Sequence, residues 1–239
     1  MSTTTAQPGI LPDTTIGQLV AAHPLLARLF DRLGFDYCCG GKQTLAAACA
    51  RRGLDPVTTA ALLESATAAL AAGPAEVDAA AMGLAALADH IEATHHAYLK
   101  AELPRLVEMA GRVATKHGWR DARLPEMASV VNTLAQEMFS HMQKEEVVLF
   151  PLVRQIEAGA RVDLAAPIAQ LESEHEAAGG LTARLRELTD GFTPNAEACN
   201  THRALLAGLA DFESDLHRHV HKENNILFPR ALAQAGAGG

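Results

Sequence analysis

A charged phrase occurs twice in this chain, each time inside a run that otherwise has the apolar pattern of a buried helix face. It reads HMQKEEVVLFP at 141–151 and HVHKENNILFP at 219–229, with His, Lys, Glu, Leu, Phe and Pro at the same offsets. A carboxylate or an imidazole inside an apolar core destabilises the fold unless it has a partner. The repeat therefore restricts both the fold and the function of the chain.

Four long helical runs, separated by clusters of turn residues, are predicted in the C-terminal part of the chain, at 83–114, 125–158, 167–190 and 196–233. Aromatic residues make up only 4% and alanine is abundant. That composition favours helices, because alanine loses no side-chain entropy in a helix. Long helices joined by short connections predict an all-α fold built on an antiparallel four-helix bundle.

Each run has one apolar stripe at alternating steps of three and four residues, which is typical of a helix face turned towards a bundle core. Every stripe contains a histidine, and in the second and fourth runs a glutamate follows it by four positions. These residues are His96, His141 with Glu145, His175, and His219 with Glu223. The stripes are also predicted to include Ala85, Asp89 and Glu92 before His96, and Val148 and Leu152 after Glu145.

The bundle is predicted to be an internal duplication of a helix pair. His96 precedes His141 by 45 positions, and His175 precedes His219 by 44. Each half therefore has the pattern of a hairpin with one histidine on its first helix and a His-x-x-x-Glu motif on its second.

Metal coordination accounts for all six buried polar residues together, whereas an ordinary i,i+4 pair explains only one motif at a time. Two glutamates can each bridge two metal ions, and four histidines can supply two ligands per ion. Nitrogen and carboxylate ligands without thiolate favour iron or manganese over structural zinc. This ligand set leaves room on each ion for a solvent-derived bridge and an exchangeable position, which predicts reactivity with oxygen or nitric oxide.

A small N-terminal helical domain is predicted at 14–71, followed by a linker at 71–82 and the bundle domain at 83–235. Its helices are expected at 24–33, 44–52 and 56–70, with a tight DYCCGGK loop at 36–42. Gly40 and Gly41 free the backbone of this loop, so Cys38 and Cys39 could present thiolates to iron, a redox partner or a damaged cluster. The alternative is local packing of one cysteine as a small hydrophobe.

Composition excludes several other classes of function. The formal net charge is −8 with no long basic run, so no nucleic-acid surface is expected. No run of about 18–20 apolar residues predicts a membrane span, and the polar N-terminus lacks a signal-peptide layout. We therefore expect a cytoplasmic protein. Four cysteines are too few for a disulfide scaffold at 239 residues, which favours reduced thiols.

Several segments together resemble the iron-sulfur cluster repair di-iron proteins, also called the repair-of-iron-centres family, whose bundle is hemerythrin-like. They are DYCCGGKQTL at 36–45, SHMQKEEVVLFP at 140–151, ESEHEAAG at 172–179, TPNAEAC at 193–199 and HKENNILFPRAL at 221–232. The resemblance implies two non-haem iron ions with carboxylate and oxo bridges. Carried over by position, it implies the ligands that the stripes also select: His96, His141, Glu145, His175, His219 and Glu223.

The resemblance further implies repair of iron-sulfur clusters damaged by nitric oxide or oxidants, by donation of iron, with damaged iron-sulfur proteins as partners and a functional role for Cys38 and Cys39. Two alternatives use the same site: a nitric oxide reductase, and a sensor of oxygen or nitric oxide. Whether the protein is an enzyme or a homodimer stays open. Oxygen-carrying hemerythrins typically use one more histidine, and the stripes offer no seventh ligand.

The remaining charged residues near the stripes are expected to be peripheral. His95 competes with its neighbour His96, which fits the stripe better. His217 and His221 lie two positions from His219, so their side chains should point away from the stripe into solvent. Glu137 and Glu174 are expected to be solvated helix charges, although either could orient a ligand or line an access path.

Overall fold

The computed structural model describes residues 10–70 and 77–236. The chain divides into two compact units, Met1–Ala81 and Met82–Gly239. Within the described ranges there is no strand, and the β-type pairing is an isolated bridge between Thr15 and Thr44. The predicted all-α fold is confirmed. Half of the predicted linker, 71–76, lies outside the described residues.

The N-terminal unit contains α1 (Ile16–Ala22), α2 (Ala27–Leu33), α3 (Leu45–Arg52) and α4 (Pro56–Leu70). Helix α1 was not predicted; it begins with a capping box in which the Thr15 side chain accepts from the backbone N–H of Gln18. The helix expected at 24–33 is a 3₁₀ turn, η1 (Pro24–Leu26), followed by α2. Gly34 ends α2 at φ 67°, a conformation that glycine adopts without strain. The unit has its own core, which includes Ile16, Leu26, Phe30, Tyr37, Leu45 and Leu63.

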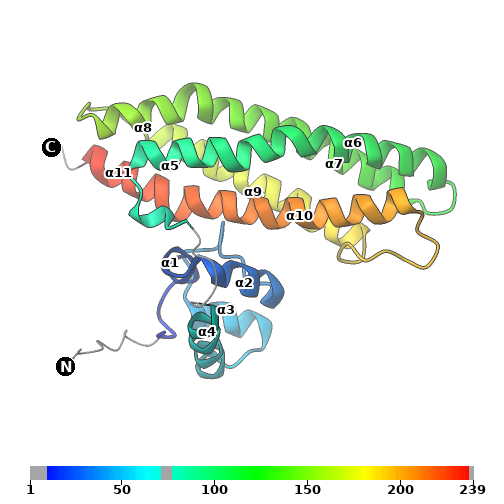
Figure 1. Ribbon diagram of the computed structural model, residues 1–239, viewed down its shortest axis with the longest axis horizontal. Coiled ribbons are helices and arrows are strands. Elements are labelled where there is room, and N and C mark those ends of the chain that lie inside the picture. Colours follow the sequence, from blue (N-terminus) through cyan, green and yellow to red (C-terminus); the bar gives the residue numbers. More distant parts are fainter. Residues whose placement is uncertain (1–9, 71–76, 237–239) are drawn as a thin grey trace. The chain divides into compact units, whose positions relative to one another are not determined.

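The second unit, after a short 3₁₀ turn η2 (Ala79–Ala81), is a bundle of four long helical runs (Figure 1). The first hairpin comprises α5 (Leu84–Ile91), η3 (Glu92–His96), α6 (Ala97–His117), α7 (Arg123–Lys144), η4 (Glu145–Leu149) and α8 (Phe150–Glu157). The second hairpin comprises α9 (Ala165–Leu188), α10 (Asn200–Lys222), η5 (Glu223–Leu227) and α11 (Phe228–Gly236). Helix α7 packs against α6 and α9, and α10 packs against α6. The fourth run begins at Asn200, later than expected, because 196–199 form a turn that ends with Cys199 as the N-cap.

Three of the four runs contain a π turn next to a predicted ligand: η3, η4 and η5. A π turn holds one more residue than an α turn, so it shifts the buried stripe by about one position. The predicted stripe is wrong on the far side of η3 and η4. Val148 is 48% exposed while Leu149 and Val153 are buried, and Leu84, Leu87, Ala88 and Ile91 are buried where Ala85, Asp89 and Glu92 were expected.

Helix α9 is the run without a π turn among its residues, all of which the structure describes. Its stripe is buried as predicted, through Ile168, Leu171, His175, Ala178, Thr182 and Leu185. The wrongly predicted stripe positions in the other runs therefore come from the π turns, and not from the apolar pattern itself.

Candidate metal centre

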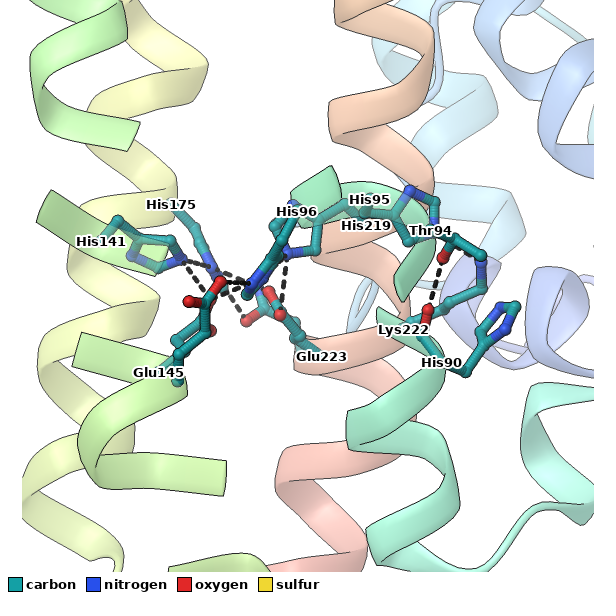
Figure 2. Close-up of polar contacts among 12 residues, drawn as sticks. His90, Thr94, His95, His96, His141, Glu145, His175, His219, Lys222 and Glu223 are labelled. Carbon is teal, nitrogen blue, oxygen red and sulfur yellow. Dashed lines mark hydrogen bonds and ion pairs between the residues drawn. The ribbon is translucent and has the colours of Figure 1, made fainter. Parts of the chain in front are cut away.

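Six buried side chains from all four runs converge at the centre of the bundle (Figure 2). They form two groups of four potential ligands, and within each group the ligand atoms all lie within 4.8 Å of one another. The groups are His96, Glu145, His219 and Glu223, and His141, Glu145, His175 and Glu223. Each residue is at most 2% exposed. The structure therefore brings together every residue predicted to bind metal, and both glutamates belong to both groups.

The four imidazoles aim their Nε2 atoms at the two carboxylates. His96 Nε2 lies 3.2 Å from Glu145 Oε2, and His175 Nε2 lies 3.2 Å from Glu223 Oε2. The two Nε2 atoms within each group are close as well, at 3.2 Å for His96 and His219 and 3.0 Å for His141 and His175. Each group takes one histidine from each hairpin, so neither hairpin forms a complete metal position alone.

The repeated Leu-Phe-Pro segments pack against two of these imidazoles. The His96 ring stacks on Phe150 with centroids 5.6 Å apart, and the His175 ring stacks on Phe228 at 6.0 Å. Both phenylalanines begin the α-helix that follows a π turn. The phrase that repeats in the sequence thus supplies one ligand pair and one packing surface to each half of the centre.

Hydrogen bonds to Nδ1 orient three of the four imidazoles. His96 Nδ1 lies 2.8 Å from Glu146 Oε1, and His141 Nδ1 lies 3.0 Å from Glu174 Oε2. His175 Nδ1 lies 2.9 Å from the side-chain oxygen of Asn224. Partners of this kind fix the tautomer and orientation of a metal-binding ring. The expectation that Glu174 is only a solvated charge is wrong, because α9 places it beside His141, across the helix interface.

The fourth ring, that of His219, has a different neighbour. His95 lies parallel to it, with an interplanar angle of 6° and centroids 5.4 Å apart. His95 is itself buried, and its Nδ1 lies 3.0 Å from both carboxylate oxygens of Asp215. Apart from the His-His doublet, nothing in the sequence predicts this contact, because both histidines are buried within the π turn η3.

The electrostatics of the centre call for a cation. Burial and the neighbouring Glu223 carboxylate raise the pKa of Glu145, because two carboxylates in an apolar interior cannot both ionise without compensation. Burial lowers the pKa of His141 to about 3 and that of His219 to about 4, so both rings are neutral and able to coordinate. Among the described residues, both Glu145 oxygens and one Glu223 oxygen are buried without a hydrogen-bond partner. Divalent cations between the carboxylates would satisfy these atoms, so the donor set fits a pair of metal ions.

Cys38 and Cys39 lie in the N-terminal unit, where they form a separate small group with Asp36. Cys38 Sγ lies 3.2 Å from Asp36 Oδ1, which also accepts from the backbone N–H of Cys39 at 3.0 Å. A hydrogen bond with Cys39, together with burial, raises the pKa of Cys38, which favours its thiol form. None of the four cysteines, Cys38, Cys39, Cys49 and Cys199, forms a disulfide.

His221 also departs from expectation. It was predicted to be exposed, but only 4% of it is accessible. Its neighbours His219 and Val220 are buried too, because this end of α10 is enclosed on more than one side. Within the described residues, no helix is long and apolar enough to cross a membrane.

Comparison with known proteins agrees with this geometry. Residues 87–231 match the hemerythrin HHE cation binding domain, and residues 12–67 match ScdA_N, a domain of unknown function. The chain is 39% identical to the iron-sulfur cluster repair protein YtfE of Escherichia coli O157:H7, over 92% of this chain and 97% of that protein. The proteins of the same name from Enterobacter sp. (strain 638) and Cronobacter sakazakii are 38% and 40% identical over the same shares.

The chain belongs to this family of YtfE-like iron-sulfur cluster repair proteins. The resemblance inferred from the sequence is confirmed. In this family member, the hemerythrin-type cation-binding domain contains two adjacent buried groups of histidine and glutamate.

Proposed function

We propose that this protein repairs iron-sulfur clusters damaged by nitric oxide or oxidants, and that it does so by delivering iron from a di-iron centre. The observation that carries the proposal is the pair of four-ligand groups that share both glutamates. Relatives that match nearly the whole chain are named iron-sulfur cluster repair proteins, which supports the same role.

The proposed cofactor is two iron ions, which the Glu145 and Glu223 carboxylates would hold together with the four histidines. Such a centre supplies redox chemistry and binding of small ligands such as nitric oxide or oxygen. Two imidazoles would bind each ion, and hydrogen bonds with Glu146, Glu174 and Asn224 keep three of these four rings in position. These ligands leave coordination positions open on each ion, so iron can be exchanged as well as held.

We assign Cys38 and Cys39 a role in the transfer of iron to the damaged iron-sulfur protein. Asp36 and the two sulfurs form a compact group of three potential ligands. Thiolates bind iron well, but the raised pKa of Cys38 means that the thiol must lose its proton when iron arrives.

The test is reactivation of a dehydratase whose cluster has been damaged by nitric oxide. Iron-loaded protein under reducing conditions should restore activity, and the Glu145→Ala variant should not, because it lacks a residue shared by both ligand groups. Cys38→Ser/Cys39→Ser should keep the loaded iron and lose reactivation. Absence of reactivation by the wild type, or equal reactivation by Glu145→Ala, would contradict the proposal.

A second function, reduction of nitric oxide at the same centre, is favoured by one observation. A pocket of about 380 Å³ between α7 and α9 borders His141 and Glu174, and offers room for a small ligand beside one metal position. With an excess of a chemical reductant, the protein should then convert nitric oxide to nitrous oxide and water over many turnovers, consuming two electrons and two protons for each nitrous oxide formed. A single stoichiometric event would rule out catalysis and leave iron delivery as the function.

A further inference from the structure

We propose that the two metal positions hold their ions unequally, and that the ion between His96 and His219 is the one that leaves first. This inference rests on the proposed di-iron centre but not on the repair reaction. It follows from a comparison of the residues that support equivalent histidines in the two hairpins.

The duplication pairs each residue near the centre with a counterpart at the same offset from its histidine. His96 corresponds to His175, and His141 corresponds to His219. The supporting residues pair in the same way: His95 with Glu174, Glu146 with Asn224, Lys144 with Lys222, and Phe150 with Phe228. The ligands and the packing phenylalanines are identical in both halves. The residues at the supporting positions are not.

At the position formed by His141 and His175, both rings are fixed. Glu174 accepts from His141 Nδ1, and its other oxygen accepts from Lys144 and from Gln170 Nε2. Glu174 is thus held by three donors, and one of them is the metal-binding ring of His141. The side-chain oxygen of Asn224 accepts from His175.

At the position formed by His96 and His219, only the His96 ring has a hydrogen-bond partner at Nδ1 among the described residues. Glu146 holds His96, but His219 Nδ1 is buried without a hydrogen-bond partner in the part of the chain that the structure describes. The residue at the position equivalent to Glu174 is His95, and it turns the face of its ring to His219. Figure 2 shows His95 on the outer side of His219, between the metal ligands and Lys222.

Both nitrogens of His95 are already engaged elsewhere. Lys222 Nζ, which can only donate, lies 2.6 Å from His95 Nε2, so Nε2 accepts and the ring proton is on Nδ1. That proton is donated to Asp215 at 3.0 Å. The pair Lys222 and His95 thus repeats the contact of Lys144 with Glu174, but no atom of His95 is left to accept from His219.

The missing hydrogen bond weakens the metal ligand. A partner on Nδ1 selects the tautomer that presents Nε2 to the metal and raises the basicity of the ring, and loss of such a partner lowers metal affinity by about 10- to 100-fold. We therefore expect a difference of about 10- to 100-fold between the two positions. The ion that remains lies between His141 and His175, and His141 borders the pocket that opens beside α7 and α9.

The experiment uses the full-length chain loaded anaerobically with two equivalents of iron(II) and titrated with a chromogenic iron(II) chelator. Two phases are expected, each of about one ion per chain, with chelator concentrations that differ by about 10- to 100-fold. Anomalous diffraction from crystals of half-depleted protein should place the remaining iron between His141 and His175. Release of both ions in one phase, or iron remaining between His96 and His219, would overturn the inference.

Three variants test the cause. His95→Glu combined with Asp215→Asn copies the support of the other half, with Lys222 available to the new carboxylate, and should bring the two phases to within about 10-fold. Asp215→Asn alone is the matched control, and its weaker position should hold iron no more tightly than that of the wild type. Glu174→Gln should weaken the tighter phase, and it keeps the inference testable if the double variant does not fold. Two separated phases in the double variant, with circular dichroism unchanged, would show that His95 is not the cause.

The chelator titration measures retention and not repair. Two unequal phases from a protein that fails to reactivate a damaged dehydratase would contradict the repair function and leave the inequality standing. A single phase from a protein that does reactivate the dehydratase would contradict the inequality and leave the repair function standing.

Discussion

The two hairpins of the bundle present the same ligands on different backbones. In the first hairpin, His96 is the last residue of the π turn η3, and its neighbour His95 is buried with it. In the second, His175 lies in the uninterrupted helix α9, and its neighbour Glu174 stays partly exposed. At this position η3 buries two consecutive side chains, whereas α9 buries one. A change of one residue in the turn thus decides whether the supporting position faces the core or solvent.

The largest expected effect is a difference in stability between a deletion in a run that has a π turn and a deletion in the run that has none. Deleting the exposed Val147 from η4 should convert the π turn to an α turn and keep the helix downstream in register. Deleting the exposed Glu176 from α9 should rotate all following residues by about 100° and take Ala178, Thr182 and Leu185 out of the core. The expected loss is on the order of the whole stability of a domain, about 5–15 kcal/mol. Thermal unfolding followed by circular dichroism would measure both. Equal loss of stability in the two deletions would show that η4 does not absorb the extra residue.

The next largest effect concerns the two glutamates, each of which belongs to both metal positions. Glu223→Ala should remove both metal ions, because its carboxylate belongs to both ligand groups. Iron content per chain would measure this, with Glu176→Ala as a control for loss of an exposed glutamate next to a ligand. A Glu223→Ala variant that keeps one tightly bound iron would mean that Glu145 alone can bridge or hold the metal.

Pairs of histidine variants should distinguish the hairpins from the metal positions. His96→Ala/His219→Ala removes both imidazoles from one position and should leave about one iron per chain. His96→Ala/His141→Ala removes the histidines of one hairpin, takes one ligand from each position, and should leave less iron than the first pair. If the two double variants retain equal iron, the positions are not each built from both hairpins.

The smallest effect lies at the connections, where the second helix of each hairpin begins. Asp121 Oδ1 accepts from the backbone N–H of Arg123 at 2.9 Å, whereas Cys199 Sγ accepts from that of His202 at 3.5 Å. Hydrogen bonds from Arg123 lower the pKa of Asp121 in the folded state, so its contribution is present above about pH 3.8 and is lost as the pH falls through the lowered value.

Asp121→Asn should therefore lower the free energy of unfolding by about 0.5 kcal/mol at pH 7 and by less at pH 3. Cys199→Ser should raise it by up to about 1 kcal/mol at both values, because serine is a better N-cap. Chemical denaturation at the two pH values would measure these differences. A pH-independent effect of Asp121→Asn would show that its charge does not contribute.

The ligands could be predicted from the sequence because each occupies a core position, where an unpaired polar side chain is costly. The residues that hydrogen-bond to the imidazoles could not be predicted in this way. Glu146 and Asn224 lie off the stripe, directly after a ligand glutamate, and only the folded backbone shows which imidazole each one reaches. Leu149 replaces Val148 in the core because of η4, and the π turn has no composition signal that distinguishes it from an α turn. Helix α1 was missed for another reason: seven residues are too few to establish a period.

Each metal position draws one histidine and one glutamate from each hairpin, and this has a consequence for assembly. Two identical half-length chains, each a single hairpin, would complete both positions by meeting across a two-fold axis. In such a homodimer the residue before the first histidine would be the same on both sides. Having His95 on one side and Glu174 on the other requires the halves to be encoded separately within one chain. Joining them is what allows two chemically identical sets of ligands to hold their ions with different strength.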